Sequence, residues 1–87
     1  MDSHEQADAS QKHVVKVFST PTCPYCHMVK AYLKGKNIPF DDIDVAQDRA
    51  QAIQMIQRSG QMGVPQLWID DNVVVGFDRQ EINRLLA

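Results

Sequence analysis

The sequence predicts one α/β domain with the element order β-α-β-α-β-β-α, built as a mixed four-stranded sheet flanked by helices. Three observations lead to this prediction. An apolar, β-branched run precedes a helical pattern near the N-terminus, and two short apolar runs enclose a pair of turn-forming residues near the C-terminus. The chain has 87 residues, of which 44% are hydrophobic, which is enough for one compact core but not for two.

The first strand and helix lie on either side of a short turn. Residues 13–19 are rich in β-branched side chains and predict a buried central strand. Residues 20–22 form the turn, and Pro24 suits the first turn of a helix. Gly35 is expected to end that helix. Four apolar side chains fall on one helical face, and we expect all of them in the core: Met28, Val29, Tyr32 and Leu33.

A second strand and helix follow in the middle of the chain. Residues 40–45 alternate between apolar and acidic side chains and predict a strand. A right-handed crossover should place this strand parallel to the first. Residues 46–59 predict a helix, with Gly60 as its C-terminal cap. The apolar side chains at helical spacing in this segment are Ala46, Ala50, Ile53 and Ile56.

The C-terminal part predicts a hairpin and a last helix. Residues 66–70 and 73–76 flank Asp71-Asn72, a pattern typical of a tight antiparallel hairpin. Residues 78–81 read Asp-Arg-Gln-Glu, which has the form of a capping box at a helix start. The side chains placed to form the accompanying hydrophobic staple are Phe77 and Ile82.

Charge and composition narrow the function classes. The formal net charge is −2 and the nine basic residues are scattered, so neither nucleic-acid binding nor electrostatic attachment to a membrane is expected. No apolar run approaches the roughly 20 residues of a membrane span, and the start of the chain lacks the layout of a signal peptide. We therefore expect a cytoplasmic protein. Residues 1–12 are polar without periodicity, which predicts a disordered leader before one domain at 13–87.

The most informative segment is Cys-Pro-Tyr-Cys at residues 23–26, which holds both cysteines of the chain. It lies where the first strand gives way to the first helix. A thiol at a helix N-terminus faces unpaired backbone N–H groups and the positive end of the helix dipole, and both favour the thiolate. Cys23 is therefore the expected nucleophile. Cys26, one turn later, is placed to attack a disulfide that Cys23 has formed, so the segment predicts reversible thiol–disulfide exchange.

A Cys-x-x-Cys pair can also be half of a zinc site, which is the alternative interpretation of these cysteines. Structural zinc needs two further ligands, and the chain has no second pair of cysteines. His27 is adjacent to Cys26 but faces another side of the helix, while His4 and His13 are isolated in the sequence. We therefore expect redox chemistry and no bound metal.

Three segments of the chain resemble the glutaredoxin family. They are the strand and motif at residues 17–26, Gly63-Val64-Pro65 before a strand, and Val-Gly-Phe-Asp at residues 75–78 before the last helix. The resemblance spans residues 14–86 and is nearest to the small dithiol glutaredoxin-like proteins, including the redoxins that serve ribonucleotide reductase. It implies the thioredoxin-like fold for the predicted α/β domain.

The resemblance also implies a substrate groove beside the cysteines. Pro65 would follow a cis peptide bond, and the backbone of Val64 would pair with an extended substrate chain in the manner of an added strand. Asp78 has a second, structural explanation as the N-cap of the last helix. The residues expected to bind substrate or glutathione are Thr22, Tyr25, Val64, Pro65, Gly76, Phe77 and Asp78.

Two departures from the family pattern leave the electron donor open. Glutathione-binding members often have a basic residue shortly before the nucleophilic cysteine, where this chain has Thr20-Pro21. Arg79 stands where many members have a second acidic residue. Lys16 and Arg58 are candidates to supply the missing positive charge. The resemblance is compatible with either glutathione or a thioredoxin reductase as the source of electrons.

The expected function is thiol–disulfide oxidoreduction of the glutaredoxin type, acting on protein disulfides, on glutathione mixed disulfides, or on both. Its partners would be disulfide-containing proteins and either glutathione or thioredoxin reductase. Glutathione would be a co-substrate, no cofactor would be bound, and the protein would be a monomer. Two alternatives stay open: an iron–sulfur cluster carrier, which the second cysteine and Pro24-Tyr25 disfavour, and a redox-regulated interaction module without turnover of its own.

Overall fold

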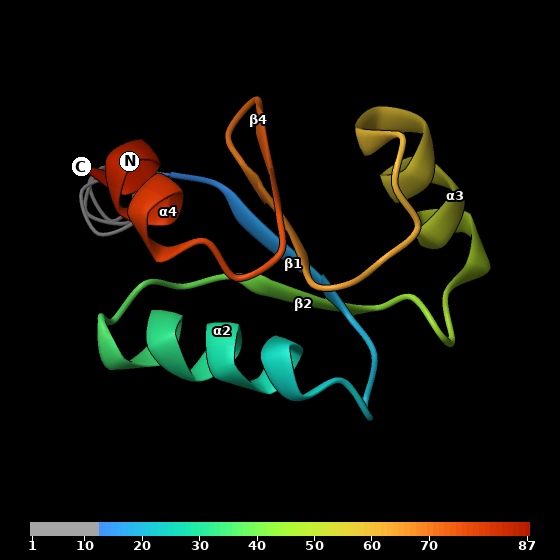
Figure 1. The fold of residues 1–87 in the computed structure, drawn as a ribbon, viewed down its shortest axis with the longest axis horizontal. Helices are drawn as coiled ribbons and strands as arrows, with labels where there is room; N and C mark the ends of the chain where they lie inside the picture. The colour runs from blue at the N-terminus through green and yellow to red at the C-terminus, as the bar shows by residue number, and fades with distance from the viewer. Residues whose placement is uncertain (1–12) are drawn as a thin grey trace, which may run out of the picture.

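The computed structural model describes residues 13–87, so the predicted leader at 1–12 lies outside the described residues. Within the described part, four strands form one sheet and three helices pack around it (Figure 1). The elements are β1 (Val15–Ser19), α2 (Pro24–Gly35), β2 (Asp41–Asp44), α3 (Arg49–Ser59), β3 (Gln66–Ile69), β4 (Asn72–Val75) and α4 (Arg79–Leu86).

The sheet is mixed and has the strand order β2-β1-β3-β4. β1 pairs in parallel with β2 and antiparallel with β3, and β3 and β4 form an antiparallel hairpin. These pairings confirm the predicted element order and the thioredoxin-like topology. β1 lies between two neighbours, so the carboxyl end of a central strand leads into the cysteine motif.

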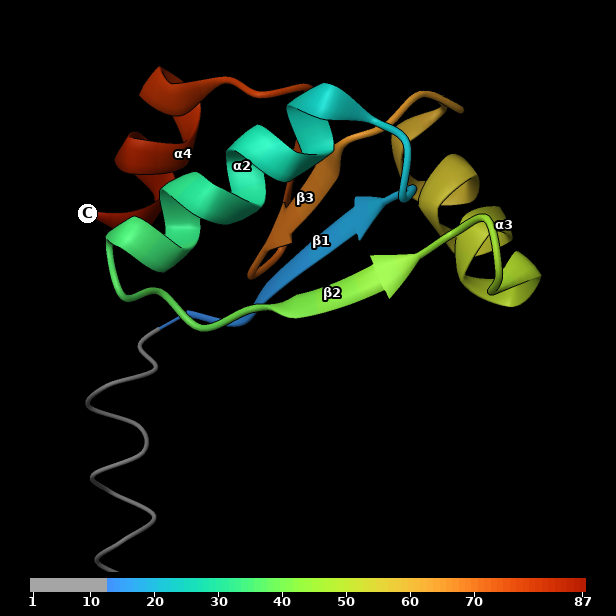
Figure 2. The same ribbon diagram turned by 90° about the horizontal axis from the view of Figure 1, so that it is seen from below.

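Most of the core lies between one face of the sheet and helices α2 and α4. Val17 of β1 is paired with Leu67 of β3, and both side chains are fully buried in one cluster. Val29 and Leu33 of α2 join this cluster, as does Ile82 of α4. Figure 2 shows the two helices over the same face of the sheet. The cluster anchors α2 to the sheet and so fixes the position of the cysteines.

Helix α3 lies against the opposite face of the sheet. Because side chains alternate along a strand, Phe18 and Trp68 point away from the cluster that contains Val17 and Leu67. Their rings lie with centroids 4.6 Å apart. The guanidinium of Arg58, in the last turn of α3, lies 4.8 Å from the centre of the Trp68 ring. Helices therefore cover both faces of the sheet.

The burial of α2 corrects one sequence expectation. Met28 is 49% exposed and does not belong to the core. The fully buried positions are Cys26, Val29 and Leu33, so the buried stripe begins with a cysteine. Tyr32 is only partly buried, at the margin of the cluster. The helix is rotated relative to the predicted stripe because Cys26 and not Met28 faces the sheet.

The start of α3 also differs from the expectation. The helix begins at Arg49 and not at Ala46, and Asp48 caps it by accepting the backbone N–H of Gln51 at 3.1 Å. The backbone N–H of Ala46 donates instead to the Asp44 carboxylate at 2.9 Å, which holds a separate turn. Gly60 ends the helix at φ 75°, as predicted. Met55 is the buried residue of this helix, whereas Ile53 is exposed.

The hairpin turn lies one residue earlier than predicted. Asp70 and Asp71 form it, and Asn72 already belongs to β4. Asp70 adopts φ 55° and its carboxylate accepts the backbone N–H of Val14 at 2.9 Å. This contact ties the turn to the start of β1.

None of the described helices is long and apolar enough to cross a membrane.

Candidate active site

Cys23 occupies the N-cap of α2, directly after the turn that follows β1. Its backbone is extended, at φ −95° and ψ 111°, and Pro24 begins the helix. The Cys23 sulfur accepts the backbone N–H of Cys26 at 3.2 Å. This is the position that Ser, Thr or Asp usually occupies at a helix start, where a side-chain acceptor satisfies a free N–H. The half-buried thiol therefore sits where the helix stabilises negative charge on sulfur.

Cys26 lies one turn further along α2 and is fully buried. Burial raises the pKa of its thiol to about 11, and the hydrogen bond with Cys23 acts in the same direction. Burial has this effect because the thiolate loses its hydration in an apolar surrounding. The two thiols thus differ in access: Cys23 is reachable from solvent, whereas Cys26 is buried and its raised pKa keeps it protonated at neutral pH.

The loop before β3 lies against the Cys23 sulfur. The Val64–Pro65 peptide bond is cis, as the family resemblance implies. The thiol of Cys23 donates to the Val64 carbonyl oxygen at 3.7 Å. Gly76, at φ 86°, donates its backbone N–H to the Pro65 carbonyl at 2.9 Å and so binds the loop after β4 to the loop before β3.

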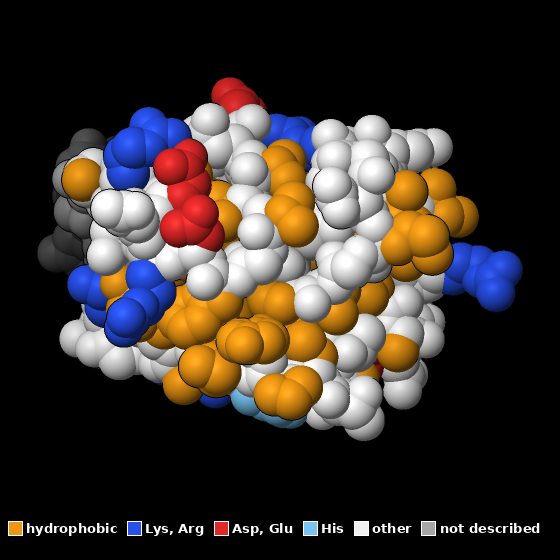
Figure 3. Space-filling model, in the orientation of Figure 1, with side chains coloured by type: hydrophobic (Ala, Val, Ile, Leu, Met, Phe, Trp, Pro, Cys, Tyr) orange, Lys and Arg blue, Asp and Glu red, His pale blue; other side chains and the backbone are white. Residues whose placement is uncertain are grey.

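A shallow hollow opens beside these loops. It has a volume of about 390 Å³ and is lined by Tyr25, Val64, Pro65, Gly76 and Phe77. Figure 3 shows hydrophobic side chains gathered on this face between α4 and the start of α2. The Phe77 ring is held from behind by an edge contact with Tyr32, with ring centroids 5.6 Å apart. None of the five lining residues is Lys, Arg, His, Asp or Glu.

Five of the seven predicted binding residues therefore meet in one hollow, and two do not line it. Thr22 is exposed on the turn before Cys23. The Asp78 carboxylate caps α4 by accepting the backbone N–H of Glu81 at 3.2 Å, so its structural explanation holds.

The two cations proposed to replace a missing basic residue do not line the hollow. Lys16 lies with its ammonium 5.6 Å from the centre of the Trp68 ring. Arg58 lies over the same ring and donates to the Asp71 carbonyl at 2.7 Å. Both are thus on the face of the sheet that α3 covers. Among residues 13–87, no group of three or more His, Cys, Asp or Glu side chains is placed to hold a metal ion.

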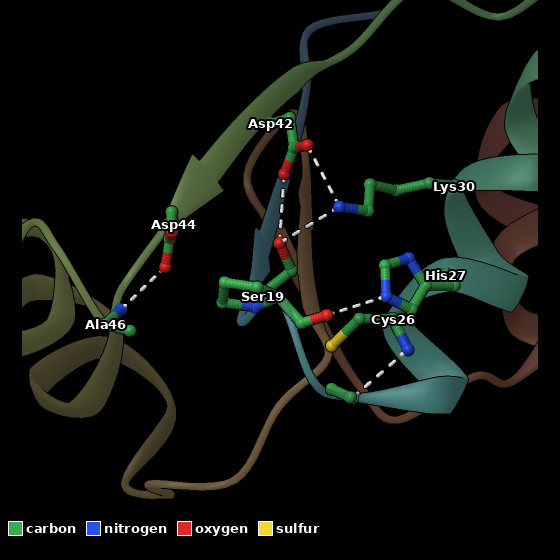
Figure 4. A network of polar contacts seen from close by, with 9 residues as sticks. Ser19, Cys26, His27, Lys30, Asp42, Asp44 and Ala46 are labelled. Carbon is green, nitrogen blue, oxygen red and sulfur yellow. Dashed lines mark hydrogen bonds and ion pairs between the residues drawn. The ribbon is translucent and has the colours of Figure 1, made fainter.

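Two further contacts near the cysteines were not predicted. The His27 ring donates from Nε2 to the Pro21 carbonyl at 2.8 Å, which fastens the turn before Cys23 to α2. Behind Cys26, Lys30, Asp42 and Ser19 form a polar network (Figure 4). The sequence signal for Lys30 is its spacing: it follows Cys26 by four residues, which places it on the same face of the helix.

A thiol at a helix N-terminus beside a cis-proline loop, on a mixed four-stranded sheet, defines a thiol redox protein of the thioredoxin-like fold. Comparison with known proteins narrows this class. The sequence model of the glutaredoxin family matches residues 15–74. The chain therefore belongs to the glutaredoxin family, and this membership supports a thiol redox function.

Individual relatives agree with this membership. The chain is 48% identical over 73 residues to a glutaredoxin-like 8.6 kDa protein in the rubredoxin operon of Clostridium pasteurianum, covering 84% of this chain and 97% of that one. It is 39% identical to glutaredoxin 3 of Escherichia coli, covering 74% and 77% of the two chains. Among solved structures, the glutaredoxin-like NrdH-redoxin of Escherichia coli superposes with a TM-score of 0.69 at 26% identity, covering 82% and 92%.

Proposed function

We propose that this protein is a thiol–disulfide oxidoreductase that reduces protein disulfides and glutathione mixed disulfides through Cys23 and Cys26. One observation carries the proposal: the two cysteines lie in the first turn of the same helix, but their thiols differ in burial. The Cys23 sulfur is half-exposed and accepts the Cys26 backbone N–H, whereas the Cys26 thiol is fully buried with a pKa of about 11. Attack by one sulfur and resolution by the other need this difference.

The proposed reaction has two exchange steps. The Cys23 thiolate attacks one sulfur of a substrate disulfide, which forms a mixed disulfide and releases the other substrate sulfur as a thiolate. Cys26 then gives up its proton and attacks the Cys23 sulfur. The Cys23–Cys26 disulfide forms, the second substrate sulfur leaves, and both released sulfurs end as thiols. Two electrons from the protein dithiol have reduced the substrate, and an external reductant must restore them.

The hollow supports recognition of an extended peptide. The Val64 backbone lies beside the Cys23 sulfur, where it can pair with a substrate chain as an additional strand would. Tyr25 and Phe77 would contact the apolar side chains that flank the substrate cysteine. Because this lining has no charge, we infer that protein disulfides are the main substrates and that glutathione mixed disulfides are secondary.

Two electron sources fit this site. The NrdH-redoxin of Escherichia coli, with its thioredoxin-like activity profile, favours a thioredoxin reductase, as does the uncharged hollow. The glutaredoxin 3 relative favours glutathione. We place the reaction in the reducing cytoplasm, with a monomeric protein, no bound cofactor, and glutathione only as a co-substrate.

The first test measures NADPH consumption with one disulfide substrate and two electron sources in parallel. One arm contains glutathione with glutathione reductase, and the other contains thioredoxin reductase. Turnover in either arm supports the oxidoreductase and identifies its donor. Absence of turnover in both arms, with correctly folded reduced protein, contradicts the proposal.

Variants of the two cysteines test their separate roles. Cys23→Ser should abolish turnover of every substrate, because no other thiol is accessible for the first attack. Cys26→Ser should lose reduction of protein disulfides but keep glutathione-dependent reduction of glutathione mixed disulfides, since free glutathione can replace the resolving thiol. If Cys26→Ser lost every activity while Cys23→Ser kept some, the two roles would be reversed.

A further inference from the structure

Behind the cysteines, Lys30 of α2 is held by a network of polar contacts at the end of the parallel strand pair (Figure 4). Its ammonium lies 3.0 Å from one carboxylate oxygen of Asp42 and 3.4 Å from the Ser19 hydroxyl. Ser19 in turn donates to the other Asp42 oxygen at 2.9 Å. The Lys30 side chain is only 16% exposed, whereas the Asp42 side chain is 48% exposed. The cation is therefore the inner member of the pair.

This network lies on the side of α2 that also holds the buried thiol. Lys30 follows Cys26 by one helical turn, so both side chains lie on the face that packs against the sheet. Ser19 ends β1, directly before the active-site turn, and is itself buried. A lysine on this helix would ordinarily extend into solvent, as the exposed Lys34 does.

Two other titratable side chains drawn in Figure 4, those of His27 and Asp44, make contacts outside this network. His27 is engaged with the Pro21 carbonyl, and the Asp44 carboxylate accepts the Ala46 backbone N–H at 2.9 Å, both visible in Figure 4. Partial burial would raise the pKa of Asp42, but hydrogen bonds from Lys30 and Ser19 outweigh it and hold that pKa below its usual value. Asp42 is thus an anion that fixes Lys30 in place.

We propose that Lys30, held by Asp42 and Ser19, is a positioning residue for the resolving step, and that its ammonium stabilises the thiolate of Cys26. This inference rests on the proposed function, in which Cys26 must lose its proton before it attacks the Cys23 mixed disulfide. In that step the sulfur–sulfur bond between Cys23 and the substrate breaks and the Cys23–Cys26 bond forms. The substrate leaves as a thiolate and takes up a proton, so the proton lost by Cys26 is balanced.

The environment of Cys26 explains why such help is needed. Burial and the hydrogen bond with Cys23 raise its thiol pKa. A backbone hydrogen bond with Thr20 lowers the pKa, and the positive charge of Lys30 acts in the same lowering direction with a smaller effect. A buried thiol without a nearby cation would have a still smaller thiolate fraction at neutral pH. Asp42 limits the effect, since its negative charge offsets part of the ammonium charge.

Two substitutions should shift the Cys26 pKa in opposite directions. Lys30→Met removes the cation and leaves Asp42 unpaired, so the pKa should rise by about one unit. Asp42→Asn keeps the cation and removes its counter-charge, so the pKa should fall. Lys30→Arg should stay near the wild-type value because it retains the charge. The measurement is a pH titration of thiolate absorbance in the ultraviolet, in a Cys23→Ser background so that only one thiol titrates.

The same variants, with both cysteines present, should show a matching change in resolution. In single-turnover release of a peptide from the Cys23 mixed disulfide at pH 7, Lys30→Met should be roughly three- to fourfold slower. A one-unit rise reduces the thiolate fraction about tenfold, and the greater basicity of the remaining thiolate recovers part of the rate. Formation of the mixed disulfide, which Cys23 performs, should change much less.

A purely structural role for the network gives a different result. Lys30→Met and Asp42→Asn would then both lower the unfolding midpoint, and neither would move the Cys26 titration; that outcome overturns the inference. The titration needs only folded protein and no turnover, so it can fail or succeed independently of the proposed oxidoreductase activity. If the Lys30 variant did not fold, Asp42→Asn alone would decide the question: a Cys26 pKa below the wild-type value supports the inference, and an unchanged pKa contradicts it.

Discussion

At the scale of single residues, the two thiols of one helix are made different by their surroundings. Cys23 sits at the N-cap, where the helix offers it the N–H of Cys26 and the positive end of its dipole. Cys26 is enclosed by the core and stays neutral to high pH. The same four residues therefore supply an accessible thiol that suits attack on a substrate disulfide and a buried thiol that suits attack on the resulting mixed disulfide.

The buried thiol predicts a loss of stability in alkaline solution. Its pKa is raised from the ordinary 9.0 to about 11, so between these values the folded protein keeps a proton that the unfolded chain has released. Stability gained from the neutral thiol is complete below pH 9 and is lost as the pH rises through this window. A shift of this size corresponds to about 2 to 3 kcal/mol. Urea unfolding of the reduced protein at several pH values measures it.

The control for this pH dependence is Cys26→Ser, which lacks the titrating group but retains the other groups that ionise in the same range. The stability difference between reduced wild type and the variant should shrink as the pH increases from 9 to 11. Parallel curves for the two proteins would mean that Cys26 has an ordinary thiol pKa.

At the scale of elements, each described helix begins with a side chain that accepts a backbone N–H. Asp48 and Asp78 cap α3 and α4 with nearly identical backbone angles, φ −107° and ψ 90° or 91°. In α2 the cap is the Cys23 sulfur. The reactive group of the protein thus occupies a position that other helices use for stability, so oxidation or substitution of Cys23 also changes a helix cap.

The two aspartate caps provide a matched test of whether Asp78 also serves substrate. Asp48→Ala and Asp78→Ala should each lower the free energy of unfolding by about 1 kcal/mol, because each leaves one helix N–H without its acceptor. If the α4 start contacts substrate, Asp78→Ala alone should raise KM for a peptide disulfide. Unchanged kinetics in both variants, with equal loss of stability, would mean that Asp78 acts only as the N-cap of α4.

At the scale of the whole molecule, one core cluster holds the active-site helix on the sheet. Leu33 and Val29 of α2 pack with residues of β1, β3, β4 and α4, so the start of α2 cannot move independently of the sheet. The hollow is built from the first turn of α2 and from the loops before β3 and after β4, which meet at one end of the sheet. The geometry between Cys23 and the cis-proline loop therefore depends on packing well away from either.

Two substitutions in α2, one at a buried position and one at an exposed position, should differ in their effect on the free energy of unfolding. Leu33→Ala removes a fully buried side chain and should cost about 2 to 5 kcal/mol through lost burial and the cavity left behind. Met28→Ala changes a side chain that is 49% exposed and should stay within about 0.5 kcal/mol of wild type. Chemical denaturation monitored by Trp68 fluorescence measures both. A large loss from Met28→Ala would place that residue in the core after all.

The sequence predicts features that depend on local pattern and misses those that depend on assembly. The order of elements along the chain, the hairpin and the Asp78 cap follow from periodicity and turn chemistry within short segments. The predicted buried face of α2 is wrong at Met28. The sequence offers more apolar side chains than the inner face of the helix can bury, and packing against the sheet buries Cys26 and leaves Met28 exposed. The Lys30 network joins residues from β1, α2 and β2, so no single segment contains its signal.

The most direct measurement identifies the cysteine that a disulfide substrate modifies first. Reduced Cys26→Ser and Cys23→Ser proteins are incubated with glutathione disulfide, and adduct formation is followed by intact mass and peptide mapping. We predict rapid formation of one glutathione adduct on Cys23 in the first protein and little modification of Cys26 in the second. An adduct that formed on Cys26 as fast as on Cys23 would contradict the division of roles between the two thiols.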